Sequence, residues 1–101
     1  MTNIERITKN EERLDRILAA NALLDVALEQ YAATMEDARK LDAYYSGPQW
    51  LKDYEDDEAG KLPKELKRGV LSEDGAYDAL TERRELLAQM LALAAKVLKN
   101  G

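Results

Sequence analysis

The chain contains no cysteine and no histidine. Without cysteine it cannot form disulfides, thiolate nucleophiles or cysteine-ligated zinc sites. Without histidine it lacks the commonest general base and the commonest side-chain ligand of transition metals. The two absences together exclude Ser-His-Asp catalysis, Cys-His catalysis and histidine-based zinc hydrolases.

The chain also lacks a basic surplus and a long apolar run. Its formal charge is −5 and its isoelectric point is near 4.8, whereas binding to duplex nucleic acid or to an anionic membrane surface normally needs a basic surface. No apolar run approaches the roughly 20 residues of a membrane span. The charged N-terminal segment MTNIERITKNEERLDRIL has no apolar core of a signal peptide. We therefore expect a cytoplasmic protein that binds neither nucleic acid nor a membrane.

Aromatic residues are scarce, and there is no phenylalanine. Apolar residues make up 46% and charged residues 35% of the 101 positions, which favours a folded and highly soluble protein over a disordered one. Alanine and leucine dominate, and both favour helix. At this length we expect one all-α domain over residues 1–101.

The N-terminal segment has a heptad pattern. Thr2 and Glu5 have the spacing of a helix-capping box. Two sets of residues then recur every seven positions and form one seam: Ile7, Leu14, Asn21, Leu28 and Met35, with Ile17, Leu24, Tyr31, Ala38 and Tyr45. The pattern predicts one long helix over about 3–45, about 64 Å in length. Thr8 and Glu11 repeat the capping spacing, which leaves open a break near Asn10.

The rest of the chain predicts a short helix, a turn and a second long helix. Ser46 is placed to cap a helix over about 48–59, and Gly60 is placed to end it. A structured turn over 60–71 follows, and Ser72 is placed to cap a long helix over about 73–99.

The two long helices are expected to run antiparallel, with the short helix and the turn packed at one end. The first would be about 24 Å longer than the second, and the apolar stripe of the second is wider than one partner covers. Both points predict a homodimer with coiled-coil-like packing, in which Asn21 would set the register. The alternative is that Asn21 marks a bend or faces solvent.

The central segment, residues 44–74, resembles a known family. The motif residues lie in three stretches: Tyr44-Tyr45-x-x-x-x-Trp50-Leu51-x-Asp53, Asp57-Glu58-x-Gly60-x-Leu62-Pro63 and Leu66-Lys67-Arg68-Gly69-Val70-Leu71-Ser72-Glu73-Asp74. They are similar to the signature of a small bacterial family catalogued as domain of unknown function 4298. The resemblance covers nearly the whole chain and implies a small all-helical fold. It implies no activity, no cofactor and no catalytic residue.

An acidic run in this segment is the candidate metal site. On a helix, Asp53, Asp56 and Asp57 would share one face and could bind Mg²⁺ loosely. Read as an EF-hand loop from Asp53, the run has Glu58 where glycine is needed and Lys64 where glutamate is needed. The simpler interpretation is a solvated face that pairs with the basic run after it.

Arg68, Gly69 and Ser72 are the candidate anion site. A guanidinium and free amides at a helix start can hold a phosphate or a carboxylate. Glu73 and Asp74 argue against this site because they already supply negative charge there.

The aromatic residues of the segment suggest a structural role. A cluster of Tyr44, Tyr45, Trp50, Tyr54 and Tyr77 could line a ligand pocket, but such clusters more often form a small core. We call the predicted folded corner that joins the two long helices the clasp, made of Tyr45, Trp50, Asp53, Arg68, Ser72 and Asp74.

The favoured function is a non-enzymatic helical module that self-associates and binds another protein. One alternative is a protein that binds divalent metal or an anion through the central segment. Another is an acidic mimic of nucleic acid that blocks a nucleic-acid-binding protein.

Overall fold

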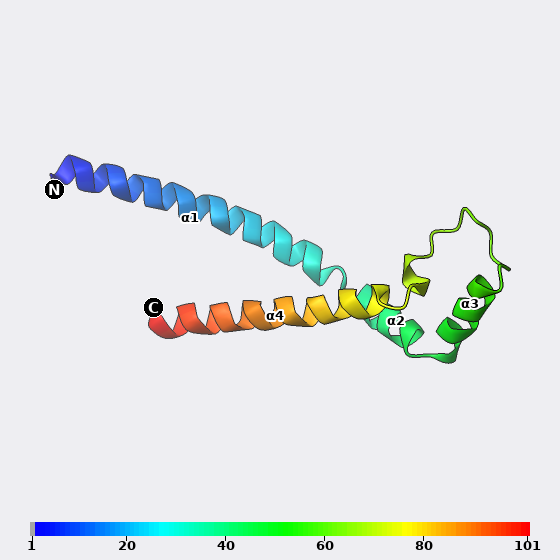
Figure 1. Ribbon diagram of the computed structural model, residues 1–101. Coiled ribbons are helices and arrows are strands. Elements are labelled where there is room, and N and C mark those ends of the chain that lie inside the picture. The colour runs from blue at the N-terminus through cyan, green and yellow to red at the C-terminus, as the bar shows by residue number, and fades with distance from the viewer. Residues whose placement is uncertain (1) are drawn as a thin grey trace. The chain divides into compact units, whose positions relative to one another are not determined.

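The computed structural model describes residues 2–101, in which every regular element is a helix. In chain order they form α1 (Asn3–Ala32), α2 (Met35–Tyr45), α3 (Pro48–Glu58), the 3-10 helix η1 (Gly69–Leu71) and α4 (Gly75–Asn100) (Figure 1). No strand occurs among these described residues. The predicted all-α class, with a short helix and a structured turn between long helices, is confirmed. In the described part of the chain, no helix is both long enough and apolar enough to cross a membrane.

The chain divides into two compact units, and the boundary along the chain lies between Asp37 and Ala38. The first unit consists of α1 and the start of α2. The second contains the rest of α2, then α3, η1 and α4. The antiparallel pairing of the two long helices would join these units, and it stays a prediction.

The predicted cap of α1 is present. The Glu5 backbone N–H donates to Thr2 Oγ1 at 3.2 Å, and the Thr2 hydroxyl donates to Glu5 Oε1 at 3.2 Å. The first of these bonds satisfies one of the backbone N–H groups that a helix start leaves open. The helix continues through Asn10, whose side-chain amide donates to the Arg6 carbonyl at 2.8 Å. The possible break near Asn10 does not occur.

The expected continuous helix over 3–45 is wrong, because Ala33 and Thr34 separate α1 from α2. The Tyr31 carbonyl accepts the Thr34 backbone N–H at 3.0 Å and also the Thr34 hydroxyl at 2.7 Å. A threonine hydroxyl that competes for a helical carbonyl replaces the regular i to i+4 pattern with a tighter turn. The heptad pattern could not reveal this turn because the apolar spacing continues across it.

The ends of α3 follow mainly from glycine and proline. Gly47, with extended backbone, is the N-cap in place of the predicted Ser46, and Pro48 occupies the first turn. At the other end Gly60 has a φ of 71°. The Gly60 N–H donates to the Asp57 carbonyl, and the Lys61 N–H donates to the Asp56 carbonyl, both at 3.0 Å. This pair of bonds is a Schellman motif.

Asp74 occupies the N-cap position of α4, so the prediction of Ser72 as the N-cap is wrong, and Ser72 lies at the end of η1 just before the helix. Its backbone is extended, and its Oγ accepts the Gly75 backbone N–H at 3.0 Å. The regular helix begins at Gly75, two residues later than expected. The predicted cap therefore acts through the turn that precedes the helix.

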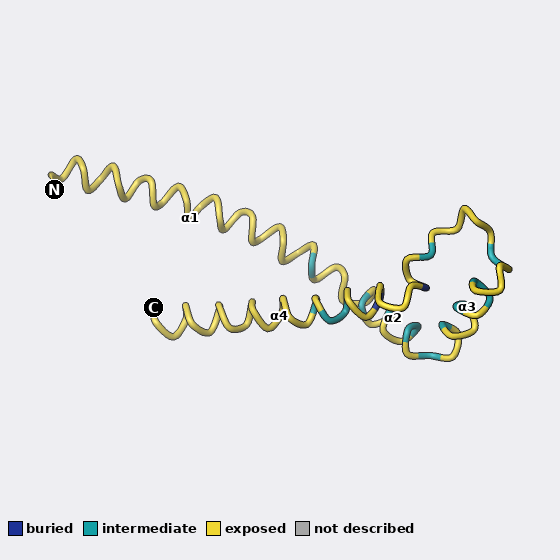
Figure 2. The backbone as a smooth tube through the Cα atoms, viewed as in Figure 1, coloured by how far each residue is buried: buried dark blue, intermediate teal, exposed yellow. Residues whose placement is uncertain are grey.

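The buried core of the described residues is very small. Leu71 at the end of η1 and Ala76 in the first turn of α4 are its two buried hydrophobic residues (Figure 2). Both belong to the second unit. That core lies where the turn meets α4.

Candidate functional site

An aromatic stack connects α2, α3 and the turn before α4. The Trp50 ring lies 5.2 Å from the Tyr45 ring in an edge-on arrangement and 5.2 Å from the Tyr54 ring in a stacked one. Trp50 Nε1 donates to the Val70 carbonyl at 2.9 Å, and the Tyr45 hydroxyl donates to the Glu73 carbonyl at 3.2 Å. The rings supply apolar contact while their polar atoms bind backbone oxygens. This is the small core that the sequence favoured.

Arg68 ties the turn to α3. Its guanidinium forms an ion pair with Asp57 and donates to the Pro63 and Leu66 carbonyls. The Asp57 side chain is only 18% exposed. A planar guanidinium can make these bonds at once because its donors point in fixed directions. Arg68 therefore closes the loop that follows α3.

Asp53 accepts a hydrogen bond from Tyr44, a residue that the predicted clasp did not include. The Tyr44 hydroxyl donates to Asp53 Oδ2 at 2.6 Å. This hydrogen bond, with partial burial and the nearby carboxylate charge, raises the pKa of Tyr44 to about 12. The bond stabilises the protonated phenol, since a phenolate could not donate and would repel Asp53.

The three candidate metal ligands have three different partners. Asp53 binds Tyr44, Asp56 lies 3.9 Å from Lys61 Nζ, and Asp57 pairs with Arg68. Residues 2–101 contain no group of three or more carboxylates placed to hold a metal ion. The acidic run is used for pairing with neighbouring groups.

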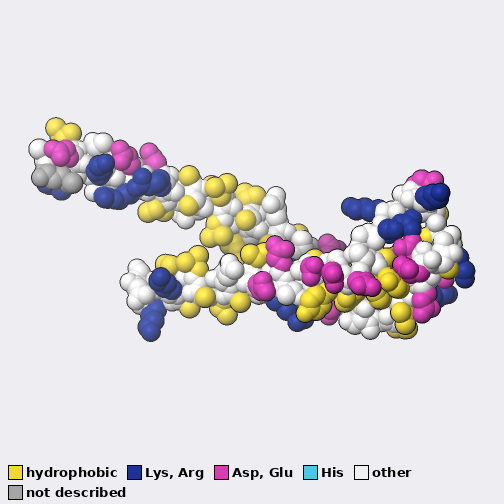
Figure 3. Space-filling view, in the orientation of Figure 1, with side chains coloured by type: hydrophobic (Ala, Val, Ile, Leu, Met, Phe, Trp, Pro, Cys, Tyr) yellow, Lys and Arg dark blue, Asp and Glu magenta, His cyan; other side chains and the backbone are white. Residues whose placement is uncertain are grey.

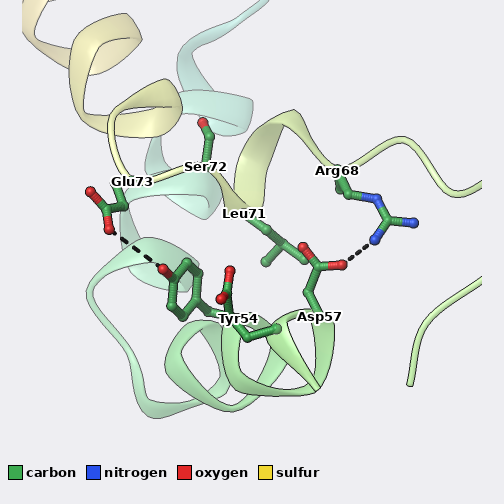
Figure 4. A pocket seen from close by; sticks show the side chains of 7 residues that line it. Tyr54, Asp57, Arg68, Leu71, Ser72 and Glu73 are labelled. Carbon is green, nitrogen blue, oxygen red and sulfur yellow. Dashed lines mark hydrogen bonds and ion pairs between the residues drawn. The ribbon is translucent and has the colours of Figure 1, made fainter. Parts of the chain in front are cut away.

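Two of the three candidate anion-binding residues lie at one pocket, but carboxylates surround them. The pocket is about 330 Å³, and its lining includes Arg68 and Ser72 together with Asp57, Glu58 and Glu73 (Figure 4). The Ser72 hydroxyl donates to the Gly69 carbonyl at 2.7 Å. Three carboxylates against one guanidinium make this pocket unfavourable for an anion.

Tyr54 lines the same pocket, and the charges there shift its pKa. Its hydroxyl donates to Glu73 Oε1 at 3.4 Å. The pKa of Tyr54 is raised, first by the charge of Glu58, then by partial burial and by Glu73 and Asp57. The direction agrees with a negative pocket, because nearby carboxylates disfavour a phenolate.

The hydrogen bonds of the predicted clasp residues run to partners outside that set. Tyr45, Trp50, Arg68 and Ser72 all bond within the central segment. Asp74 differs, since its side chain makes no capping bond and its carbonyl accepts the Asp78 N–H at 2.7 Å. Tyr77, expected in the aromatic cluster, is 58% exposed.

Sequence reasoning missed two pairings and one close approach. An acidic run followed by a basic run indicated neutralisation across the turn, but it could not identify the Asp57–Arg68 pair. Tyr44 and Asp53 lie nine positions apart, with no motif that links them. Gly75 lies three positions after the predicted cap Ser72, yet nothing in the sequence shows that a side chain there would collide with Gly69.

Comparisons with known proteins agree with the resemblance in the central segment. Searches of curated proteins and of solved structures find no match. A family model described as "Domain of unknown function (DUF4298)" matches residues 7–93. Because this match covers most of the 101 residues, the chain belongs to the DUF4298 family.

Proposed function

We propose that this protein is a non-enzymatic helical module that self-associates as a homodimer. In the proposed dimer a second copy covers the apolar faces of α1 and α4. The clasp holds α2, α3 and the start of α4 together, so that the long helices are available for association. The exposed apolar surface of these helices is the observation that supports the proposal.

The exposed apolar surface of α1 is extensive. The helix has no buried residue, and its large hydrophobic side chains are between 44% and 75% exposed. They are Ile4, Ile7, Leu14, Ile17, Leu18, Leu23, Leu24, Val26 and Leu28. The unit to which α1 belongs contains no other complete helix that could cover them.

The C-terminal half of α4 has the same character. Residues 86–95 contain no charged side chain, and Leu91 and Leu98 are 73% and 82% exposed. Hydrophobic side chains gather on this half of the helix and on the C-terminal half of α1 (Figure 3). At 3.6 residues per turn the large hydrophobics of 86–98 span an arc of roughly 160°.

The width of these arcs supports a second copy as the covering partner. A helix that packs against one neighbour needs an apolar stripe of only about 100°. Residues 17–24 of α1 also lack any charge, and Leu23 widens the apolar surface beyond the heptad seam. Two chains together offer four such apolar helices, which is the number that a four-helix arrangement needs.

The carboxylates of the central segment give the metal-binding and anion-binding alternatives less support. Asp53, Asp56 and Asp57 each have a partner of their own, and Ser72 is used at the start of α4. The sequence contains no histidine or cysteine that could activate a serine. These assignments favour an interaction role.

Sedimentation equilibrium of the full chain at tens of micromolar tests the proposal. We expect twice the mass of one 11.4 kDa chain. Leu91→Glu should shift the equilibrium towards monomer, since it places a charge in the apolar arc. Gln89→Glu adds the same charge two positions away, outside that arc, and should leave the dimer intact. A wild-type protein that is strictly monomeric at this concentration would exclude the dimer.

A further inference from the structure

The face of α4 that lies beside α2 continues to the end of the helix. Near the start of α4 this face lines two hollows of about 140 Å³ and about 240 Å³ together with residues of α2. Its residues recur every seven positions in two interleaved sets, which are Tyr77, Arg84, Leu91 and Leu98, and Thr81, Ala88 and Ala95. We call the last four of these residues, Ala88, Leu91, Ala95 and Leu98, the outer seam of α4.

The outer seam lies beyond the hollows and is open. Leu91 and Leu98 are the most exposed large hydrophobic residues of α4, at 73% and 82%, and Ala88 and Ala95 are exposed as well. Alanine and leucine alternate along the seam. Read in the opposite direction, the same order places a leucine opposite each alanine. Large and small side chains on facing positions interdigitate well, so the seam fits an antiparallel copy of itself.

The charges beside the outer seam fit the same arrangement. Glu85 and Lys99 lie on one flank of the seam, at its opposite ends, and both are exposed. Among residues 2–101 neither takes part in an ion pair. Residues on the same flank of two antiparallel helices meet, so Glu85 of one copy would lie beside Lys99 of the partner subunit, and two-fold symmetry repeats the pair. A parallel pair would gather like charges at each end.

We propose that the outer seams of two copies pack against each other in antiparallel orientation. Leu91 packs against Ala95 of the partner subunit, and Leu98 packs against Ala88 of the partner subunit. The Glu85–Lys99 ion pairs flank this contact, which extends about 21 Å along the helix at 1.5 Å per residue. The inference rests on the proposed homodimer and specifies where, and in which direction, the two copies meet.

Cysteine cross-linking tests the direction. The chain has no cysteine of its own, so one introduced cysteine reports the contact. Ala92 lies seven positions from both Glu85 and Lys99 on the same flank, so the antiparallel contact places it beside Ala92 of the partner subunit. Under mild oxidation at tens of micromolar, Ala92→Cys should form a disulfide-linked dimer on a non-reducing gel. Gln89→Cys, on the far side of α4, should not.

Exchange of charge tests the ion pairs. Glu85→Lys and Lys99→Glu should each weaken self-association roughly tenfold in sedimentation equilibrium, because like charges then meet at both pairs. An equimolar mixture of these two variants should associate as tightly as the wild type, because both pairs regain opposite charges. Glu82→Lys makes the same charge change on the far side of α4 and should change the dissociation constant by less than about twofold.

The outcomes distinguish this inference from the proposed function. A wild-type protein that is monomeric at tens of micromolar overturns both. A wild-type dimer in which Ala92→Cys does not cross-link, or in which the mixture is as weak as either variant, overturns the outer-seam contact alone and assigns the seam to another occupant. Equal cross-linking of Gln89→Cys and Ala92→Cys indicates random collision and also overturns it. Circular dichroism of each variant ensures that the compared proteins are folded.

Discussion

Tyr44 shows how one hydrogen bond changes the chemistry of a side chain. Its hydroxyl donates to Asp53 at 2.6 Å, and its pKa is raised to about 12. Because the folded-state pKa lies above the unfolded value of about 10, the bond contributes its full stabilisation below pH 10. That contribution is lost as the pH rises from about 10 to about 12.

We predict that Tyr44 ionises later than an ordinary tyrosine. A pH titration followed by NMR of the ring carbon bonded to the hydroxyl should show a midpoint near 12 for Tyr44. In Asp53→Asn the midpoint should fall towards 10, since the acceptor charge is removed. The signal is assigned by its loss in Tyr44→Phe. A wild-type midpoint near 10 would contradict the Tyr44–Asp53 bond.

Arg68 is the second residue for which the structure makes a sharp prediction. Arg68→Lys keeps the charge but cannot reach Asp57, Pro63 and Leu66 together, so the protein should lose about 1–2 kcal/mol of unfolding free energy. Urea denaturation measures this change. Lys67→Gln, at an exposed neighbouring position, should change stability by less than about 0.5 kcal/mol. Equal effects of the two substitutions would show that Arg68 does not tie the turn to α3.

At the scale of elements, the junction of η1 and α4 depends on the absence of a side chain at residue 75. A Cβ on Gly75 would lie 2.5 Å from the Gly69 carbonyl oxygen and 2.5 Å from Ser72 Oγ. The carbonyl belongs to the backbone, so the turn itself must move to relieve the contact. Gly69 faces no such neighbour within 4 Å.

We predict opposite outcomes for two alanine substitutions at this junction. Gly75→Ala should destabilise the protein by about 1–3 kcal/mol, because it overpacks the turn. Gly69→Ala should be neutral or stabilise by about 0.4–1 kcal/mol, because it restricts the unfolded chain. Thermal unfolding followed by circular dichroism at 222 nm compares them. A tolerated Gly75→Ala would mean that the turn is looser than described.

Helix ends were predictable to the extent that their signals are local. Thr2 and Gly60 act at the helix ends where the sequence placed them, because caps and stops involve residues a few positions apart. Ser72 bonds in the turn just before α4, and Asp74 takes the N-cap position. The turn at Ala33–Thr34 was missed because Thr34 competes for a carbonyl without interrupting the apolar pattern. Ser46 was misassigned because Gly47 and Pro48 meet the same need one residue later.

At the scale of the whole molecule, the exposed apolar faces predict that thermal stability depends on protein concentration. If a second copy covers α1 and α4, folding and association are coupled, and stability rises with protein concentration. The thermal midpoint should increase by roughly 3–6 °C for each tenfold rise in concentration. Scans between low and high micromolar concentration measure it. A midpoint independent of concentration would contradict the proposed dimer.

The helical class, most helix ends and the family of this chain could be read from its residues alone. These properties depend on composition, on seven-residue spacing and on capping residues, all of which act over short stretches. The pairing of Asp57 with Arg68 and the bond from Tyr44 to Asp53 emerged only from the folded chain. Each brings together groups on different elements, and the path of the chain between them sets that distance.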